Sequence, residues 1–285
     1  MKKVSPDFFV IGTMKSGTTW LMECLNYHPE ITCFNEIMVL SLLRDGIGKL
    51  LNNVNKQIID GATTTFNEFV YPVPEFIHQD VNDIVSIVWK NLIEKTEKKS
   101  KFFGEKSPDY VGLLEDIVQW YPNTKLIHIV RDPKDVAVSY YYHYKREAKF
   151  YDDGKISQVK DLSQPSKRER GKESLILDAI TLWKSDQSVI ETMKKRFPER
   201  FITIKYEDMN DPNTLDSVYK FIGAKSSIDL CNCVLDATNI KERPRNQNSF
   251  FTFGKSKNWK TELDDEMISY VNSLLGWWKN MYNYD

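Results

Sequence analysis

The sequence has little of what would crosslink it, anchor it in a membrane or attract a nucleic acid. Its four cysteines give no disulfide framework and no paired zinc-finger spacing, and no other residues have metal-ligand spacing. No segment approaches the roughly 18 apolar residues of a membrane span, and residues 1–12 lack the apolar core of a signal peptide. The net charge of −1 argues against nonspecific nucleic-acid binding. We therefore expect a cytoplasmic protein without a metal ion and without a membrane or nucleic-acid partner.

The pattern of apolar residues predicts an α/β fold. Short, β-prone runs alternate along the chain with helical patterns, and such alternation is typical of a central parallel sheet flanked by helices on both faces. In these folds ligands bind at the carboxyl ends of the strands. We expect a single domain over residues 1–285. The predicted strands are residues 8–11, 31–34, 101–103, 125–130 and 201–205.

Helices and loops fill the rest of the predicted sheet. Residues 60–74 are expected to form a long loop that covers a site. The polar segment 149–172 has two open interpretations, a mobile lid or a plain surface insertion. Residues 240–260 are predicted to be irregular and basic, and a closing helix carries Trp277 and Trp278. The predicted helices are residues 18–28, 36–53, 81–98, 112–120, 133–144, 174–196 and 214–222.

The loop after the first strand has the form of an anion site. A small-residue loop that opens a helix points its backbone N–H groups at a ligand, and the helix dipole favours negative charge there. Gly12 and Gly17 have P-loop spacing and Thr19 is at the Ser/Thr position, but Thr18 replaces the P-loop lysine. The lysine of this loop, Lys15, lies inside it, where it would meet the atoms that bridge a first phosphate to the group attached to it. The loop thus predicts binding of a phosphorylated nucleotide. It lacks the lysine that contacts the β- and γ-phosphates of a triphosphate in a P-loop.

A second motif, HIVRDPKDVAVSYYYHYK, covers residues 128–145. Arg131 ends a predicted strand and Ser139 lies two turns into the next helix, so a guanidinium fork and a hydroxyl could hold a second phosphate together. The alternative is a helix that begins at Asp132 and Pro133 beside an ordinary surface arginine. The phosphate interpretation is favoured because this motif and the anion loop are both expected at the carboxyl edge of one sheet.

These motifs resemble the two nucleotide-binding signatures of sulfotransferases, the enzymes that use 3′-phosphoadenosine 5′-phosphosulfate (PAPS). The resemblance rests on KSGTTW at residues 15–20 and RDPKDVAVSYYYHY at residues 131–144. YEDM at 206–209 and G-x-x-x-NWK at 254–260 are similar to later segments of that family. The matches keep the family's order over most of the chain, so together they are specific.

The resemblance implies how the donor is bound. Arg131 and Ser139 would hold the 3′-phosphate, and Tyr206 would lie near the adenine. Lys15 would balance the charge that develops on the bridging oxygen as the S–O bond breaks. The residues implied to surround the 5′-phosphosulfate are Lys15, Ser16, Gly17, Thr18 and Thr19.

One part of the implied donor site departs from the family pattern. Cytosolic members carry Arg-Lys-Gly in the late loop, and the matching residues here are Thr252, Phe253 and Gly254. We expect other cations to replace that clamp on the 3′-phosphate. The candidates are Arg245, Lys255 and Lys257.

The general base implied by the resemblance is a glutamate. Cytosolic small-molecule sulfotransferases use a histidine between the two nucleotide motifs, in the segment that here reads GEKSPDY and holds no histidine. GEKSPDY, at 104–110, instead resembles the E-K-x-P-x-Y segment of carbohydrate sulfotransferases, which makes Glu105 the implied base and Lys106 an orienting cation. The alternative is that the Glu105–Lys106 pair is structural. Glu36 could also face the acceptor, and His143 shares a helix face with Ser139.

The expected activity is PAPS-dependent transfer of a sulfuryl group to the hydroxyl or amine of a small-molecule acceptor, leaving adenosine 3′,5′-bisphosphate (PAP). A carbohydrate acceptor, sulfated on oxygen or nitrogen, is the alternative within the family. A P-loop kinase or NTPase is the alternative from another class, and a nucleotide-binding protein without turnover is a third. The displaced lysine and the lack of a strand ending directly in aspartate argue against the kinase. No dimer motif follows residue 259, so the oligomeric state is left open.

Overall fold

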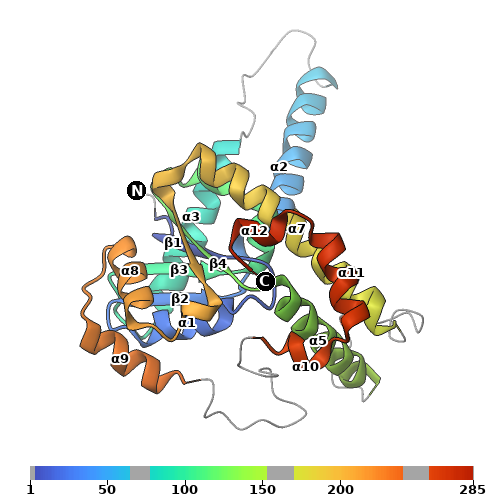
Figure 1. Cartoon of the computed structure of the whole chain (residues 1–285). Coiled ribbons are helices and arrows are strands. Elements are labelled where there is room, and N and C mark those ends of the chain that lie inside the picture. The colour runs from blue at the N-terminus through green and yellow to red at the C-terminus, as the bar shows by residue number, and fades with distance from the viewer. Residues whose placement is uncertain (1–3, 65–77, 153–169, 240–256, 285) are drawn as a thin grey trace.

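The computed structural model describes residues 4–64, 78–152, 170–239 and 257–284. In this part of the chain five parallel strands form one sheet in the order β2-β3-β1-β4-β5 (Figure 1). The predicted α/β fold with a parallel sheet is confirmed. The strands are β1 (Phe8–Ile11), β2 (Ile31–Asn35), β3 (Phe102–Lys106), β4 (Lys125–Val130) and β5 (Phe201–Lys205).

Helices cover both faces of the sheet because each strand buries alternate side chains on opposite sides. Phe8 and Val10 of β1 pack with one set of helices, and Phe9 and Ile11 pack with another. The first face is covered by α1 (Thr18–Tyr27), α8 (Pro212–Ile222) and α9 (Ile228–Ala237). The second is covered by α2 (Val39–Thr64), α3 (His78–Lys95), the 3₁₀ helix η1 (Pro108–Leu113) and α4 (Leu114–Trp120).

A third apolar cluster fixes the helices that follow β4 and end the chain. Trp183 is fully buried in this cluster, together with Val130 and Trp259. The cluster places the last helices beside the second motif. Its elements are α5 (Pro133–Asp152), α7 (Lys172–Arg196), α10 (Trp259–Glu262), α11 (Asp265–Leu275) and α12 (Trp278–Met281).

Several predicted boundaries are wrong. Helix α2 continues to Thr64, through the first residues of the loop expected at 60–74, and α5 continues to Asp152, into the expected lid at 149–172. Both extensions are rich in polar and charged residues, and composition alone does not separate such a helix from a loop. The rest of the expected loop and most of the expected lid fall in residues 65–77 and 153–169, which lie outside the described residues.

Some elements also differ in kind from the prediction. Strand β3 includes Glu105 and Lys106, which were expected to follow it. Helix α9 was not predicted, although Ser227 caps it by accepting a hydrogen bond from the N–H of Leu230 (3.2 Å). Trp277 precedes α12 and does not lie within a closing helix. None of the described helices is long and apolar enough to cross a bilayer.

The sheet order places the site. Strand β1 is central, with β3 on one side and β4 on the other. Because all of these strands are parallel, the segments that follow β1, β2, β3, β4 and β5 leave the same edge of the sheet. This edge collects the anion loop, the second motif and the glutamates named from the sequence.

Candidate active site

The loop after β1 is built so closely against its neighbours that two positions accept only glycine. Gly12 has a φ of 149°, and a Cβ there would lie 2.4 Å from the carbonyl oxygen of Ile129. Gly17 has a φ of 97°, and a Cβ there would lie 2.3 Å from the ring of Tyr206. Lys15, between them, is also left-handed, with a φ of 71°. The loop is therefore held tightly to β4 and to the segment after β5.

This loop has the properties of an anion site. The Ser16 hydroxyl is buried and has no hydrogen-bond partner within the described chain, which is unusual for a buried polar atom. Burial, together with the positive charges of Arg146 and Arg131, lowers the pKa of Lys15 to about 8. A bound anion would provide an acceptor for Ser16 and offset the positive charge around Lys15. The residues present therefore fit a phosphosulfate or phosphate group.

Arg131 joins the three segments that the sequence connected with the nucleotide. Its guanidinium lies 4.3 Å from the centre of the Tyr206 ring, and its NH1 donates to the carbonyl oxygen of Lys15 (3.1 Å). The Trp183 indole donates to the carbonyl oxygen of Arg131 (3.2 Å). Lys15, Arg131 and Tyr206 are thus brought into one contiguous group, with Arg131 almost wholly buried.

The hydrogen bond and ring contact that join Lys15, Arg131 and Tyr206 do not involve the other residues predicted to bind the nucleotide, and two of those residues are not described. Thr18 is buried and Thr19 half-buried at the start of α1, and Ser139 is half-buried on α5. Lys257 lies against the start of α5, where its backbone N–H donates to Asp135 Oδ2 (2.6 Å). The other two predicted cations, Arg245 and Lys255, lie outside the described residues.

Glu105, the sequence-predicted base, is fully buried. Its Oε1 accepts from the N–H of Met38 (2.6 Å) and its Oε2 accepts from the Tyr110 hydroxyl (2.6 Å), which itself accepts from the N–H of Leu40 (3.1 Å). Burial raises the pKa of Glu105 to about 7, against the lowering effect of these hydrogen bonds. The carboxylate therefore fastens the connection between β2 and α2.

Glu36 is a second carboxylate at the carboxyl ends of the strands, and unlike Glu105 its side chain is partly exposed to solvent. It follows β2 directly, and its backbone N–H donates to the carbonyl oxygen of Lys106 (2.9 Å). Its Oε1 is hydrogen-bonded to Lys106 Nζ, and the side chain of Glu36 is 48% exposed while that of Lys106 is 1% exposed. From the sequence Glu36 was a weaker candidate than Glu105, although its place at a strand end was visible there.

The backbone around Glu36 is strained. Glu36 has a φ of 46° and Met38 a φ of 56°, and neither is glycine. Such left-handed residues persist only where the surroundings hold them, and they cluster at functional sites. Here Glu105 holds the N–H of Met38 and Lys106 holds Glu36. The buried pair therefore presents Glu36 at the sheet edge.

A set of charged side chains lies further along α5. His143 Nδ1 accepts from Arg146 (2.7 Å) and its Nε2 donates to Glu147 (3.0 Å). Burial, Lys15 and Arg146 lower the pKa of His143 to about 3, so the ring is neutral at physiological pH. Both ring nitrogens are engaged, which argues against His143 as a base.

Comparisons with known proteins bear on this arrangement. The model of the sulfotransferase family matches residues 6–227. Sulfotransferase 1 family member D1 of Mus musculus is 24% identical over 284 residues, covering 97% of this chain and 78% of that protein.

Two solved structures resemble the fold. The sulfotransferase domain from the Curacin biosynthetic pathway gives a TM-score of 0.56 at 16% identity, over 100% of this chain and 99% of that one. Mouse sulfotransferase SULT7A1, complexed with PAP, gives a TM-score of 0.56 at 18% identity, over 95% of this chain and 82% of that one. At these identities the two structures show the shared fold.

Proposed function

The chain belongs to the sulfotransferase family, whose model matches residues 6–227, and on this premise we propose that it transfers a sulfuryl group from PAPS to a hydroxyl or amine of a small molecule. The observation that carries the proposal is the group formed by Lys15, Arg131 and Tyr206, with the buried Ser16 hydroxyl beside it. A protein of similar fold was solved with PAP. PAP is the product that this reaction would leave.

The residues around the loop suit the two ends of this donor. Ser16 and the N–H groups that open α1 would hold the 5′ end, with Lys15, Gly17, Thr18 and Thr19 around it. Arg131, Ser139 and Lys257 would hold the 3′-phosphate, and Arg245 and Lys255 stay predictions from sequence. Tyr206 would lie against the adenine. The donor, when bound, would supply a sulfuryl group on a phosphate leaving group.

Lys15 would contribute the main electrostatic effect. A cation held inside the loop would lie close to where negative charge develops on the leaving oxygen and would stabilise that charge. Its carbonyl oxygen is fixed by Arg131, which limits how far the loop can move. Transfer to an acceptor placed in line would then need only removal of the acceptor proton.

We assign the removal of that proton to Glu36. A base must come within hydrogen-bond distance of the acceptor, and Glu36 is half-exposed while Glu105 is fully buried with both oxygens bound. Glu105 would hold the β2–α2 connection and Lys106 would orient Glu36. The sequence-based assignment of Glu105 as base is the competing proposal, and its pKa of about 7 suits that role.

Two isosteric variants separate these assignments. Glu36→Gln should lower kcat by about 100-fold or more with the PAP affinity retained, since the amide keeps the shape and loses the basic oxygen. Glu105→Gln should lower the melting temperature and affect kcat less. Glu105→Gln with a normal melting temperature and lost kcat, beside an active Glu36→Gln, would restore Glu105 as the base.

The rival nucleotide kinase is disfavoured by a buried threonine. The P-loop lysine position holds Thr18, which is 4% exposed and carries no charge for a triphosphate. Isothermal titration with PAP and with ATP tests the class directly. We expect PAP to bind at least about tenfold more tightly, a difference of roughly 1.4 kcal/mol. Tighter ATP binding accompanied by hydrolysis would overturn the proposal.

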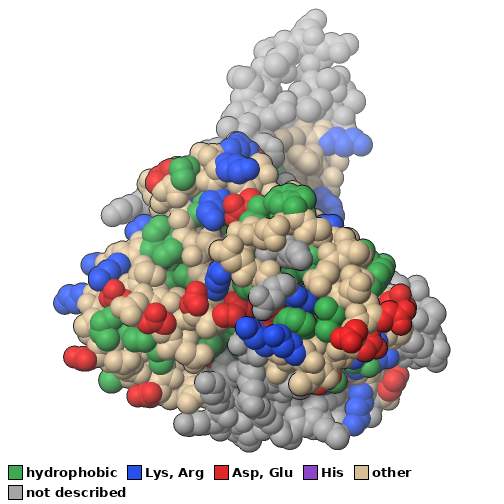
Figure 2. All heavy atoms as spheres, in the orientation of Figure 1, with side chains coloured by type: hydrophobic (Ala, Val, Ile, Leu, Met, Phe, Trp, Pro, Cys, Tyr) green, Lys and Arg blue, Asp and Glu red, His purple; other side chains and the backbone are tan. Residues whose placement is uncertain are grey.

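A small acceptor is favoured over a long anionic carbohydrate by the one face drawn in Figure 2. On that face the described acidic and basic side chains are interspersed, and a polysaccharide would need a continuous basic track. The sequence also suggests aromatic residues in loops that shape the acceptor pocket, and these lie outside the described residues: Phe66, Phe69, Tyr71, Phe76, Phe250 and Phe251. A screen of phenols, alcohols, amines and oligosaccharides with PAPS, read by mass gain, would identify the acceptor class.

A further inference from the structure

Residues 282–284, which follow α12, are linked by hydrogen bonds through Gln187 and Glu207 to both parts of the site that the nucleotide motifs form. The Tyr282 hydroxyl lies 2.7 Å from Glu191 Oε1 and 3.0 Å from Gln187 Oε1. The side-chain amide of Gln187 donates to the Thr13 hydroxyl (3.4 Å), inside the anion loop. Tyr282 is therefore linked to the first motif through one buried side chain of α7.

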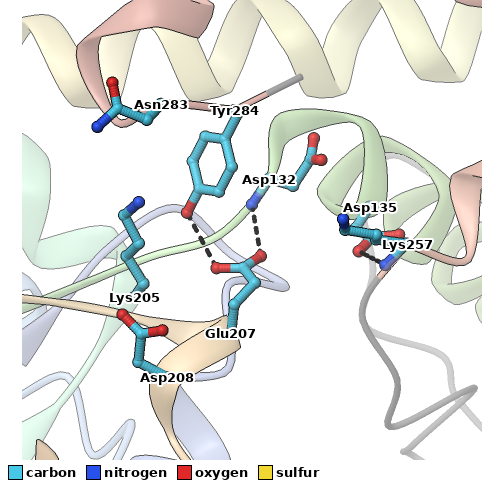
Figure 3. A pocket seen from close by; sticks show the side chains of 8 residues that line it. All are labelled: Asp132, Asp135, Lys205, Glu207, Asp208, Lys257, Asn283 and Tyr284. Atoms are coloured by element: carbon cyan, nitrogen blue, oxygen red, sulfur yellow. Dashed lines mark hydrogen bonds between the residues drawn. The ribbon is translucent and has the colours of Figure 1, made fainter.

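Tyr284 reaches the second motif. Its hydroxyl donates to Glu207 Oε2 (3.0 Å), and Glu207 Oε1 accepts from the backbone N–H of Asp132 (3.0 Å), as Figure 3 shows. Asp132 follows Arg131 in sequence, and Glu207 follows Tyr206. One carboxylate thus spans the ends of β4 and β5 beside the Arg131–Tyr206 pair, and Tyr284 supplies its second donor.

The surroundings make that hydroxyl difficult to replace. Tyr284 and Glu207 line a pocket of about 200 Å³ that is rich in acidic groups. Burial, with the charges of Asp135 and Glu207 adding to it, raises the pKa of Asp132 to about 6, and burial beside Glu207 raises the pKa of Tyr284. The lining holds four carboxylates and two lysines, Lys205 and Lys257, and the neutral O–H of Tyr284 is the donor that is hydrogen-bonded to Glu207 Oε2. The pocket lining is Asp132, Asp135, Lys205, Glu207, Asp208, Lys257, Asn283 and Tyr284 (Figure 3).

From these contacts we infer that residues 282–284 are a positioning clasp for the nucleotide site, in which Tyr284 acts through Glu207 on the Arg131–Tyr206 pair. This inference rests on the proposed function, because the nucleotide is the ligand that the pair would hold. Without the hydroxyl, Glu207 can turn toward the water of the pocket and release the N–H of Asp132. The backbone at Asp132, next to Arg131, is then no longer held. The Arg131 guanidinium is therefore less well ordered for binding the 3′-phosphate.

Tyr284→Phe is the direct test, since it removes the hydroxyl and keeps the ring. We expect the Kd for PAP and the KM for PAPS to rise about five- to tenfold, with kcat at saturating PAPS nearly unchanged. A tyrosine elsewhere provides the matched control. The buried Tyr219 hydroxyl donates to the carbonyl oxygen of Cys24 (2.9 Å), so Tyr219→Phe should lower the melting temperature and leave the PAP affinity unchanged.

The path through Glu207 is tested by a double-mutant cycle. Tyr284→Phe and Glu207→Gln should have non-additive effects on PAP binding, because each breaks the same link. Additive effects, or a PAP affinity in Tyr284→Phe equal to wild type, would overturn the clasp. Failure of the wild-type protein to bind PAP would instead refute the proposed function, so the two failures are distinguishable.

Discussion

Lys15 is a cation held where burial and two arginines disfavour its charge. Burial lowers its pKa, and Arg146 and Arg131 lower it further, to about 8. Glu105 has the opposite character, an acid whose burial disfavours ionisation. Both residues keep a shifted pKa only because neighbouring segments hold them in place, and such shifts are common where a group takes part in function.

The pKa of Lys15 predicts a pH dependence. The role proposed for Lys15, balancing charge on the leaving oxygen, requires a protonated side chain, so kcat/KM should fall as pH rises through about 8. In Lys15→Arg the guanidinium stays charged, so the residual activity should keep its value across that range. A wild-type profile that stays flat as pH rises from one unit below that pKa to one unit above it would contradict the assigned role. Initial rates at low PAPS give the profile.

Glu105 predicts a dependence of stability on pH. Its pKa is raised from the ordinary value of 4.5 to about 7 in the folded chain, so the folded state binds more protons than the unfolded state in between. The free energy of unfolding should therefore fall as pH rises from about 4.5 to 7, by on the order of 3 kcal/mol at most from this group. Glu105→Gln should show a flatter profile in urea titrations. Equal slopes in the two proteins would mean that the carboxyl is not buried and bonded in solution.

At the scale of elements, the site depends on how closely the loop after β1 meets the segment after β5. Gly17 ends that loop and Tyr206 begins η4 (Tyr206–Asp208), and no atom larger than hydrogen fits between them. The Tyr206 ring also lies against Arg131 and beside Trp20. A displacement of this ring would disturb the first and second motifs together.

Gly17→Ala tests that contact. The added Cβ would meet the Tyr206 ring at 2.3 Å in a left-handed conformation, so we expect loss of PAP binding and a lower melting temperature. Gly112→Ala is the matched control, because a Cβ at Gly112 would meet no atom within 4 Å and the backbone there is not left-handed. If Gly17→Ala binds PAP as the wild type does, the close packing of loop and ring does not govern the site.

At the scale of the whole molecule, the two ends of the parallel strands differ in role. The carboxyl ends carry the candidate site, and the amino ends carry contacts that stabilise the fold. Arg200 precedes β5 at the edge away from the site and is buried. Its guanidinium donates to the carbonyl oxygens of Thr124 (3.0 Å), Val118 (3.0 Å) and Tyr121 (2.7 Å). These bonds tie α4 and the turn before β4 to the sheet, and none of them involves a residue of the nucleotide motifs.

Arg200→Ala should therefore affect folding and leave binding intact. Leaving three buried carbonyls without a donor should lower the free energy of unfolding by about 2–4 kcal/mol. The Kd for PAP, measured below the onset of unfolding, should stay close to that of the wild type. A large loss of PAP affinity in the folded variant would show that the two edges are coupled. Chemical denaturation and calorimetry on the same samples provide both values.

Features that depend on residues close together in the sequence could be predicted from it, and features that depend on contacts between distant residues could not. A phosphate-binding loop consists of consecutive residues, so the spacing of Gly12 and Gly17 predicted such a loop with Lys15 displaced inside it, and the alternation of strands and helices predicted the fold class. Helix ends at Thr64 and Asp152 were missed because a helix rich in polar residues and a polar loop have similar compositions.

By itself, then, the sequence determined the fold class and the family resemblance, because these depend on local pattern and motif order, and it predicted an anion site in the loop after β1. Tertiary structure decided the strand order and which glutamate is exposed. Glu105 is held by a hydrogen bond from Met38, 67 residues away, and Glu207 is held by Tyr284, 77 residues away. Contacts of that range have no periodicity in the sequence, and they exist only once the sheet brings its strand ends together.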